Sequence, residues 1–314
     1  MIEPEPEVLP EDLWRPRAAA HAARVDRFAA PFLDRRMTGR KHPVEDFLFT
    51  YYTQKPGQLR RWHPGPGVVL AGDAARERAG WKFYAHSAAG AGMELDAGAF
   101  ATARAEALGF ARVILSGTAA RPAQFSCFGL HEWAMAYRSE ENGIRHEYLP
   151  LRLGASGTDR VVEENRIRCT HFDAFRFYAP QAVALNELTP TRETQRDLEQ
   201  PGCLHANMDL YKWAYKLSPA VPSDLVMDCF ELAWDIRTMD MQASPYDLGD
   251  WGHEPIRIET PAGKARYADL QRGFAERSAV LRGRLLTAFE DIDAAVAATS
   301  GAISGTTPVA GVVP

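Results

Sequence analysis

Hydrophobic residues change their spacing in the middle third of this chain, and that change limits the folds open to it. Between Gln124 and Arg138, in "QFSCFGLHEWAMAYR", the apolar and aromatic side chains stand mostly at odd positions. The segment "CTHFDAFRFYAP", from Cys169 to Pro180, follows the same alternation. A repeat of two residues is typical of an extended strand, whose successive side chains point to opposite faces. We therefore expect both segments to be strands.

The first and last thirds show helical signals instead. "LWRPRAAAHAARVDRFAAPFLDRRMTG" is rich in Ala and Arg and ends near Gly39, and Asp96 is placed to cap a helix that follows it. Only "GVVLAG" and "WKFYAH" read as short strands there. Further helices are expected from Thr189 to Gln200, in "NMDLYKWAYKL", from Ser223 onwards and from Ala262 to Ala298. The sequence thus predicts an α+β fold with a central, mainly antiparallel sheet flanked by N-terminal and C-terminal helices.

The chain of 314 residues is expected to form a single α+β catalytic domain over residues 11–298. Residues 1–10 are rich in Pro and Glu and read as a disordered tail, and residues 299–314 read as a disordered, low-complexity tail. No stretch is apolar enough to suggest a membrane span or a secretory signal. The four cysteines form no CxxC pair, which favours a reducing, cytoplasmic location.

The charge is unevenly distributed along the chain. The whole chain carries a formal net charge of −5, yet residues 35–63 contain seven Lys or Arg side chains against two carboxylates, which is +5 locally. Such a strip can bind phosphate, although it can equally be an ordinary solvated surface. The candidate nucleic-acid contacts within it are Arg35, Arg36, Arg60 and Arg61.

Three segments place a histidine near a carboxylate in aromatic surroundings. They contain His131 with Glu132, His171 with Asp173, and His205 with Asp209. A single buried histidine is usually a hydrogen-bonded core residue, but three similar segments favour a shared pocket. Such a pocket can bind Zn or Fe through imidazoles and a carboxylate. It can also use a desolvated carboxylate as a general base on water.

Neither familiar metal signature is complete. His131 and Glu132 lack a second histidine four residues on, because Met135 occupies that position. His171 and Asp173 have the His-x-Asp spacing of iron oxygenases, but His205 follows a predicted helix. For a metal-dependent enzyme acting on a small anionic substrate, the candidate Fe or Zn ligands are His131, His171, His205 and Asp173. Arg152 or Arg176 would then hold the carboxylate or phosphate of the substrate.

Several long phrases together resemble one bacterial, chiefly actinobacterial, family that is labelled 3-methyladenine DNA glycosylase. They include "HPVEDFLFTYY", "FGLHEWAMAYR", "LPLRLG", "THFDAFRFYAP", "QPGCLHANMDLYKW" and "DIRTMDMQASPYDL", and the similarity covers roughly residues 42–289. The resemblance implies a DNA repair N-glycosylase that removes alkylated bases, with DNA as its partner and no cofactor.

A glycosylase must flip a base, stack it on aromatic side chains and activate water. The expected water activator is Asp173, oriented by His171 or His131, with Glu132 as a further catalytic candidate. The expected substrate contacts are Trp133, Tyr178, Trp213, Arg152 and Arg176. Three hypotheses therefore remain open on the residues: a glycosylase, a metal-dependent enzyme, and an acidic scaffold whose histidines are merely buried.

Overall fold

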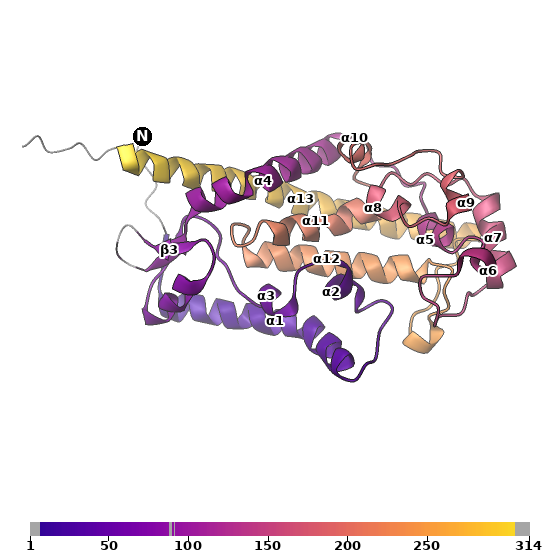
Figure 1. Cartoon of the computed structure of the whole chain (residues 1–314), viewed down its shortest axis with the longest axis horizontal. Coiled ribbons are helices and arrows are strands. Elements are labelled where there is room, and N and C mark those ends of the chain that lie inside the picture. The colour runs from indigo at the N-terminus through magenta and orange to yellow at the C-terminus, as the bar shows by residue number, and fades with distance from the viewer. Residues whose placement is uncertain (1–6, 88–89, 91, 305–314) are drawn as a thin grey trace, which may run out of the picture.

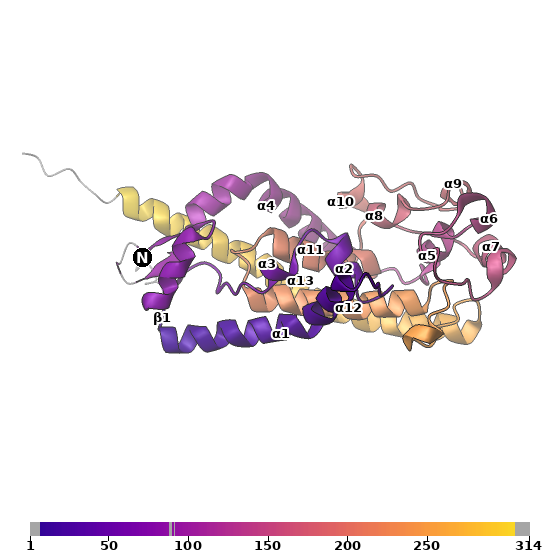
Figure 2. The same ribbon diagram turned by 60° about the horizontal axis from the view of Figure 1, so that its bottom comes forward.

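Five helices that run along the length of the molecule carry most of the fold (Figures 1 and 2). They are α1 (Glu11–Met37), α4 (Ala97–Ala120), α11 (Leu204–Lys216), α12 (Ser223–Gln242) and α13 (Pro261–Ser304). In this computed structural model, residues 7–87, 90 and 92–304 are described, with side chains up to residue 298. Helix α11 packs most extensively against α12, and α4 packs against α13.

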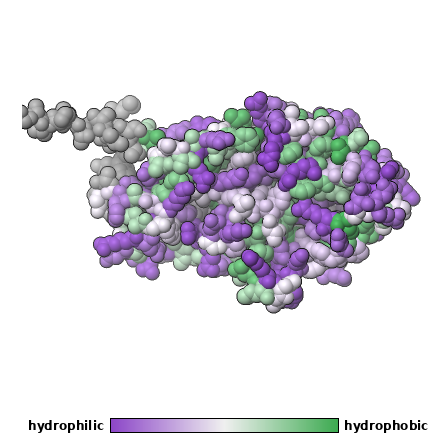
Figure 3. All heavy atoms as spheres, in the orientation of Figure 1, coloured by the Kyte–Doolittle hydropathy of each residue, from purple (hydrophilic) through white to green (hydrophobic). Residues whose placement is uncertain are grey.

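Helix α12 is central because its sequence is apolar on more than one face. The buried side chains include Phe230, Leu232, Ile236 and Met239, and they join the largest core cluster together with residues of α4, α11 and α13. A helix that is hydrophobic nearly all round is stable only when other elements cover it. On the face shown in Figure 3, hydrophilic and hydrophobic residues are interspersed.

The sheet is built from four short strands of the first third of the chain. They are β1 (Glu7–Leu9), β2 (Val68–Leu70), β3 (Tyr84–His86) and β4 (Met93–Leu95), in the order β1-β2-β4-β3. The β1–β2 pair is parallel, and the other two pairs are antiparallel. The α+β class and the mostly antiparallel sheet are confirmed. The sheet lies at one end of the molecule, however, and not at its centre (Figures 1 and 2).

Short helices and turns connect the long elements. They are α2 (Phe47–Tyr51), α3 (Pro56–Leu59), η1 (Asp73–Gly80), α5 (Leu130–Met135), α6 (Ser139–Asn142), α7 (Gly154–Glu164), α8 (Phe172–Phe175), α9 (Pro180–Val183), α10 (Gln195–Leu198) and η2 (Gly249–Trp251). Helices α5 to α9 gather at the end of the molecule away from the sheet (Figure 1). The expected cap of α4 is present, since Asp96 accepts a hydrogen bond from the backbone of Ala99 at 2.8 Å.

The two strands predicted for the middle third are wrong. Residues 124–138 contain helix α5, entered through Gly129 in a left-handed conformation, and residues 169–180 contain helix α8. Both segments are short and enclosed on several sides. Burial from several directions produces apolar positions without a helical repeat, and over so few residues it imitates the alternation of a strand. The helix expected from Thr189 to Gln200 is likewise reduced to the single turn α10.

The expected tails are partly ordered. Glu7–Leu9 forms strand β1 and Pro10 precedes α1, so that part of the predicted N-terminal tail is wrong; residues 1–6 lie outside the described residues. Helix α13 continues to Ser304, beyond the expected end at Ala298, and residues 305–314 also lie outside the described residues. None of the helices in the described ranges combines the length and the apolar character needed to cross a membrane.

Candidate metal centre

Three histidines from distant segments meet between the ends of the long helices. His131 lies in α5, His171 immediately precedes α8, and His205 lies in the first turn of α11. The ring centroids of His131 and His205 are 4.5 Å apart, and those of His171 and His205 are 5.4 Å apart. The histidines that the sequence suggested for a shared pocket are therefore brought together, with His205 in the middle.

The first triad consists of His131, His205 and Asp240, each with one donor atom within 4.8 Å of the other two. Helix α12 presents Asp240 from its buried side. His131 Nε2 lies 2.9 Å from Asp240 Oδ2, and Nδ1 lies 3.4 Å from Cys127 Sγ. Burial alone would lower the pKa of His131, but the carboxylate of Asp240 raises that pKa well above its ordinary value.

His205 is the unusual member of this triad. Burial lowers the pKa of His205 well below its ordinary value, and the neighbouring His131 lowers it further. Among the described residues, neither ring nitrogen of His205 forms a hydrogen bond. Asp240 Oδ1 is buried and also lacks a partner within the described ranges. The triad thus holds a neutral imidazole and a carboxylate oxygen with unused lone pairs, which are the forms that bind a metal.

The second triad consists of His171, Glu199 and Asp209, all buried. His171 Nε2 lies 3.2 Å from Glu199 Oε1 and 3.4 Å from Asp209 Oδ2. Neither contact has hydrogen-bond geometry, so the attraction is mainly electrostatic. Burial disfavours the charged imidazole, yet the Asp209 and Glu199 carboxylates raise the pKa of His171 to about 9.

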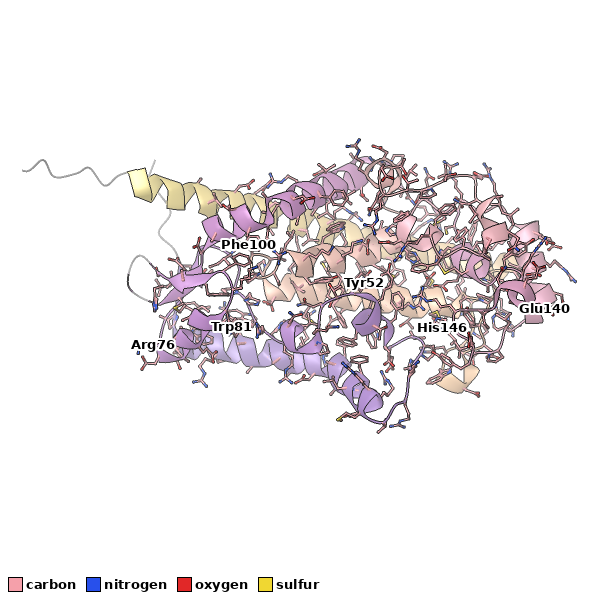
Figure 4. All side chains as sticks on the ribbon, viewed as in Figure 1. Tyr52, Arg76, Trp81, Phe100, Glu140 and His146 are labelled. Atoms are coloured by element: carbon pink, nitrogen blue, oxygen red, sulfur yellow. The ribbon has the colours of Figure 1, made fainter. Side chains whose placement is uncertain are left out.

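The carboxylates of the second triad are already occupied. Tyr52 donates a hydrogen bond to Asp209 Oδ1 at 3.0 Å, Lys212 contacts Asp209 Oδ2, and Gln195 donates to Glu199 Oε1. Tyr52 lies beside the long helices near the middle of the view in Figure 4. These carboxylate oxygens therefore have partners without a metal, and His171, whose ring nitrogens form no hydrogen bond within the described residues, is held by charge alone.

The charges across both triads balance in the metal-free chain. Protonated His131, protonated His171 and Lys212 supply three positive charges. The carboxylates of Glu199, Asp209 and Asp240 supply three negative charges. Buried charges are tolerated when they are paired in this way, so both triads can exist in the folded chain before any ion binds.

A narrow pocket opens on the two histidines of the first triad. Its lining includes His131, His205, Cys127, Cys203 and Tyr267. The volume in which the centre of a water molecule fits is about 20 Å³. That is room for about one water molecule or one similarly small ligand. The first triad thus combines two histidines that line the pocket with an Asp240 oxygen that has no partner among the described residues.

Asp173, expected as the water activator or as a metal ligand, is not a member of either triad. It lies in α8, where it pairs with Arg176 Nε at 3.0 Å and approaches Lys212 Nζ at 3.5 Å. It lines a separate small cavity together with His146 and His205. Figure 4 labels His146 toward the end where the short helices gather.

Glu132 and the expected aromatic contacts have structural partners. Glu132 accepts a hydrogen bond from Arg237 at 2.9 Å. Trp133 is fully buried and donates its indole N–H to the carbonyl of Ala243 at 2.8 Å. Tyr178 and Trp213 are buried in the same core cluster. None of the three aromatic rings is open to a stacked base in this structure.

The arginines expected to hold an anion are also paired. Arg152 forms an ion pair with Glu259 at 2.9 Å, and Arg176 pairs with Asp173. In the basic strip, Arg35 pairs with Glu45 and Asp46, and Arg60 pairs with Asp26. Arg61 lies over the ring of Trp81, and exposed Arg36 has no ion-pair partner among the described residues. These pairs lower the charge that the strip presents to an outside partner.

Sequence reasoning missed Asp240 and Glu199. A signal existed for Asp240, because it stands four residues after Ile236 in α12 and continues the buried apolar stripe as a carboxylate. Glu199 follows a single helical turn and carries no periodic signal. Its position beside His171 depends on long-range packing alone.

We compared the chain with models of protein families, with curated proteins and with solved structures, and none of them matched it. The geometry of the two triads and the pocket is therefore the basis for inferring a function.

Proposed function

We propose that the chain is a metal-dependent enzyme that binds one divalent metal ion through His131, His205 and Asp240. The observation that carries the proposal is that His205 and Asp240 Oδ1 have no hydrogen-bond partner among the described residues, in a triad whose two histidines line a pocket with room for about one water molecule. Catalytic metal sites use three protein ligands and keep a position open for water or substrate. A purely structural site would instead be closed on all sides.

The donor set favours iron or zinc. Two imidazoles and one carboxylate form the set typical of non-haem Fe(II) enzymes, and zinc accepts the same donors. Hard cations such as Mg²⁺ and Ca²⁺ prefer sites made of oxygen alone. An open side of the site suits either ion, so metal analysis decides between them.

When bound, such an ion polarises a substrate oxygen or activates water. The residues around the pocket support this chemistry by hydrogen bonding and charge. Burial raises the pKa of Tyr267 well above its ordinary value, and the nearby Asp240 raises it further. The phenol therefore stays protonated, and its buried hydroxyl has no partner among the described residues. It can donate a hydrogen bond to a ligand in the pocket.

Charge balance favours an anionic ligand at the same place. A divalent ion brings two positive charges and displaces one proton from His131. The balanced network then gains one positive charge, which hydroxide or a substrate anion can neutralise. Buried net charge is costly unless it is compensated, so the loaded site selects for such a ligand.

The DNA N-glycosylase implied by the family resemblance is the second proposal. Exposed Arg36 and Arg61 favour it as contacts for phosphate. It ranks second because the expected stacking residues are core residues and the expected water activator is ion-paired. Duplex DNA binding that weakens steeply with added salt would support it.

Metal analysis of purified protein, reconstituted with Fe(II) or Zn(II) and then desalted, tests the first proposal. We expect about one equivalent per chain in the parent protein and in His86→Ala, an exposed histidine far from the triads. We expect loss of the ion in His205→Ala, because one of three ligands is removed. Full occupancy in folded His205→Ala, or an empty parent protein, would contradict the proposal.

A further inference from the structure

A larger cavity adjoins the metal pocket. It encloses about 300 Å³, and its lining includes Ser126, Phe128, Leu130, Arg166, Arg168 and Lys264. Ser126 and Arg168 also line the pocket of the first triad, so the two spaces are neighbours that share a wall. A ligand in the larger cavity therefore lies next to the pocket that His131 and His205 line.

Cations dominate this larger cavity. Arg166 and Arg168 come from the segment after α7, and Lys264 comes from the first turns of α13. The carboxylate that pairs with these cations within the described ranges is that of Glu187, which contacts Arg166 and lies 3.7 Å from Arg168. Lys264 donates a hydrogen bond to the neutral side chain of Asn165 at 2.5 Å. Three cations against one carboxylate leave an excess of two positive charges.

Arg168 has unused hydrogen-bonding capacity. Its Nε is buried and has no partner among the described residues, and its contact with Glu187 is longer than a hydrogen bond. A buried donor without a partner costs free energy that a bound acceptor recovers. A guanidinium group suits the planar carboxylate or the oxygens of a phosphate.

We infer that this cavity binds the anionic head of a small organic substrate, a carboxylate or a phosphate, and directs the rest of the molecule toward the first triad. Phe128 and Leu130 give the cavity an apolar wall, which suits an organic body better than an inorganic ion. The volume is at the lower end of that of small-molecule sites. The inference rests on the proposed function for its reactive end, but anion binding can be tested without a metal.

Calorimetric titration of the metal-free protein with benzoate and with phenyl phosphate provides the test. The two probes share an apolar ring and differ in the head group, so the tighter one identifies the preferred anion. We expect Arg168→Gln to weaken binding about tenfold or more, since a charge-assisted hydrogen bond is lost. Arg160→Gln, an exposed arginine of α7 outside the cavity, should bind like the parent protein.

Lys264→Gln provides a second variant in case Arg168→Gln fails to fold, as judged by circular dichroism, and it should weaken binding in the same direction. Binding of neither probe to the parent protein, or equal binding by the folded variants, would overturn the inference. Because the titrations contain no metal, metal loading without probe binding would overturn the anion cavity alone. Probe binding without metal loading would overturn the proposed function and leave the cavity standing.

Discussion

At the scale of single residues, Glu132 and Arg237 form a buried ion pair beside the histidine cluster. Arg237 also lies 4.0 Å from the centre of the Phe47 ring. Removing one partner of a buried pair leaves an uncompensated charge and typically costs about 3–5 kcal/mol. We expect Arg237→Met to lower the free energy of unfolding by about that amount, as measured by urea denaturation.

The double variant Glu132→Gln/Arg237→Met separates the buried charge from the lost packing. Replacing both charges removes the uncompensated carboxylate, so most of the lost stability should return. A double variant as unstable as Arg237→Met would show that packing around Arg237, and not the pairing of Glu132, sets the cost.

The same residues show why sequence reasoning found half of the site. The three histidines stood out because each combined an imidazole with aromatic neighbours. Their partners did not follow from proximity in sequence: Asp240 pairs with His131, and Glu199 and Asp209 face His171. A carboxylate two residues away along the chain is not the nearest one in space when the local structure is a turn or a short helix.

At the scale of elements, α11 serves both triads. His205, Asp209 and Lys212 are separated by four and three residues, so they share one face of the helix. The position of α11 along its axis and its rotation about that axis therefore set the geometry of both triads together. Gly202 lies just before this helix, and a Cβ built on it would come within 2.3 Å of the carbonyl oxygen of Gln124.

Because that contact is with backbone, Gly202→Ala must push the start of α11 away from the segment at Gln124. We expect a loss of about 1–3 kcal/mol in the free energy of unfolding, as for an overpacked site. Metal affinity should fall as well, because His205 follows three residues later. Thermal melting and metal titration measure the two effects.

Gly273→Ala is the matched control for that variant. Gly273 lies within α13, and a Cβ there would meet nothing within 4 Å. Alanine is the better helix former by about 0.5–1 kcal/mol, so this variant should be slightly more stable and should bind metal normally. If Gly202→Ala also keeps full stability and affinity, the packing of this turn does not position α11.

The elements also divide by how well the sequence predicts them. Helices α1, α4, α12 and α13 are long, α4 also has the expected Asp96 cap, and the sequence predicts all four. The segments around α5 and α8 are too short for a repeat to be decisive. Both are enclosed by the rest of the molecule, so their conformation is set by tertiary packing. His131 and His171 lie on or beside these short segments, and His205 and Asp240 lie on the long helices α11 and α12. How the short segments meet the long helices depends on tertiary packing, which is why the geometry of the site could not be derived from the sequence.

At the scale of the whole molecule, the stability of the fold depends on pH in two opposite ways. Some buried histidines have a lowered pKa in the folded chain, and others have a raised pKa. Burial, with a contribution from Arg237, lowers the pKa of His146 to about 4, and burial with Arg78 lowers that of His63 to about 3. For both, the unfolded chain binds protons at a higher pH than the folded chain. Their contribution to stability is therefore present above about pH 6.5 and is lost as the pH falls.

His171 acts in the opposite direction. Its pKa in the folded chain is about 9, against an ordinary value of 6.5. The folded state therefore holds this proton more tightly, and its contribution is complete below pH 6.5 and is lost as the pH rises through 9. This difference between the pKa of His171 in the folded and unfolded chain corresponds to about 3 kcal/mol in the free energy of unfolding. The metal-free protein should thus be most stable near pH 6.5 and weaker on both sides.

Urea midpoints of the metal-free protein between pH 4 and pH 9.5 measure this profile. His171→Gln should be less stable than the parent protein at pH 6.5 and should show a shallower decline between pH 6.5 and 9, while the decline toward pH 4 remains. Part of the alkaline decline should persist, because the pKa of His131 is also raised in the folded chain. The variant His86→Gln, at an exposed histidine, should leave both the acidic and the alkaline decline in stability unchanged. A parent protein whose stability keeps rising through pH 9 would mean that His171 is not held as an imidazolium, because a neutral ring gains nothing from the surrounding carboxylates. In that case the second triad would need another cation, and a bound metal would become the simplest source of it.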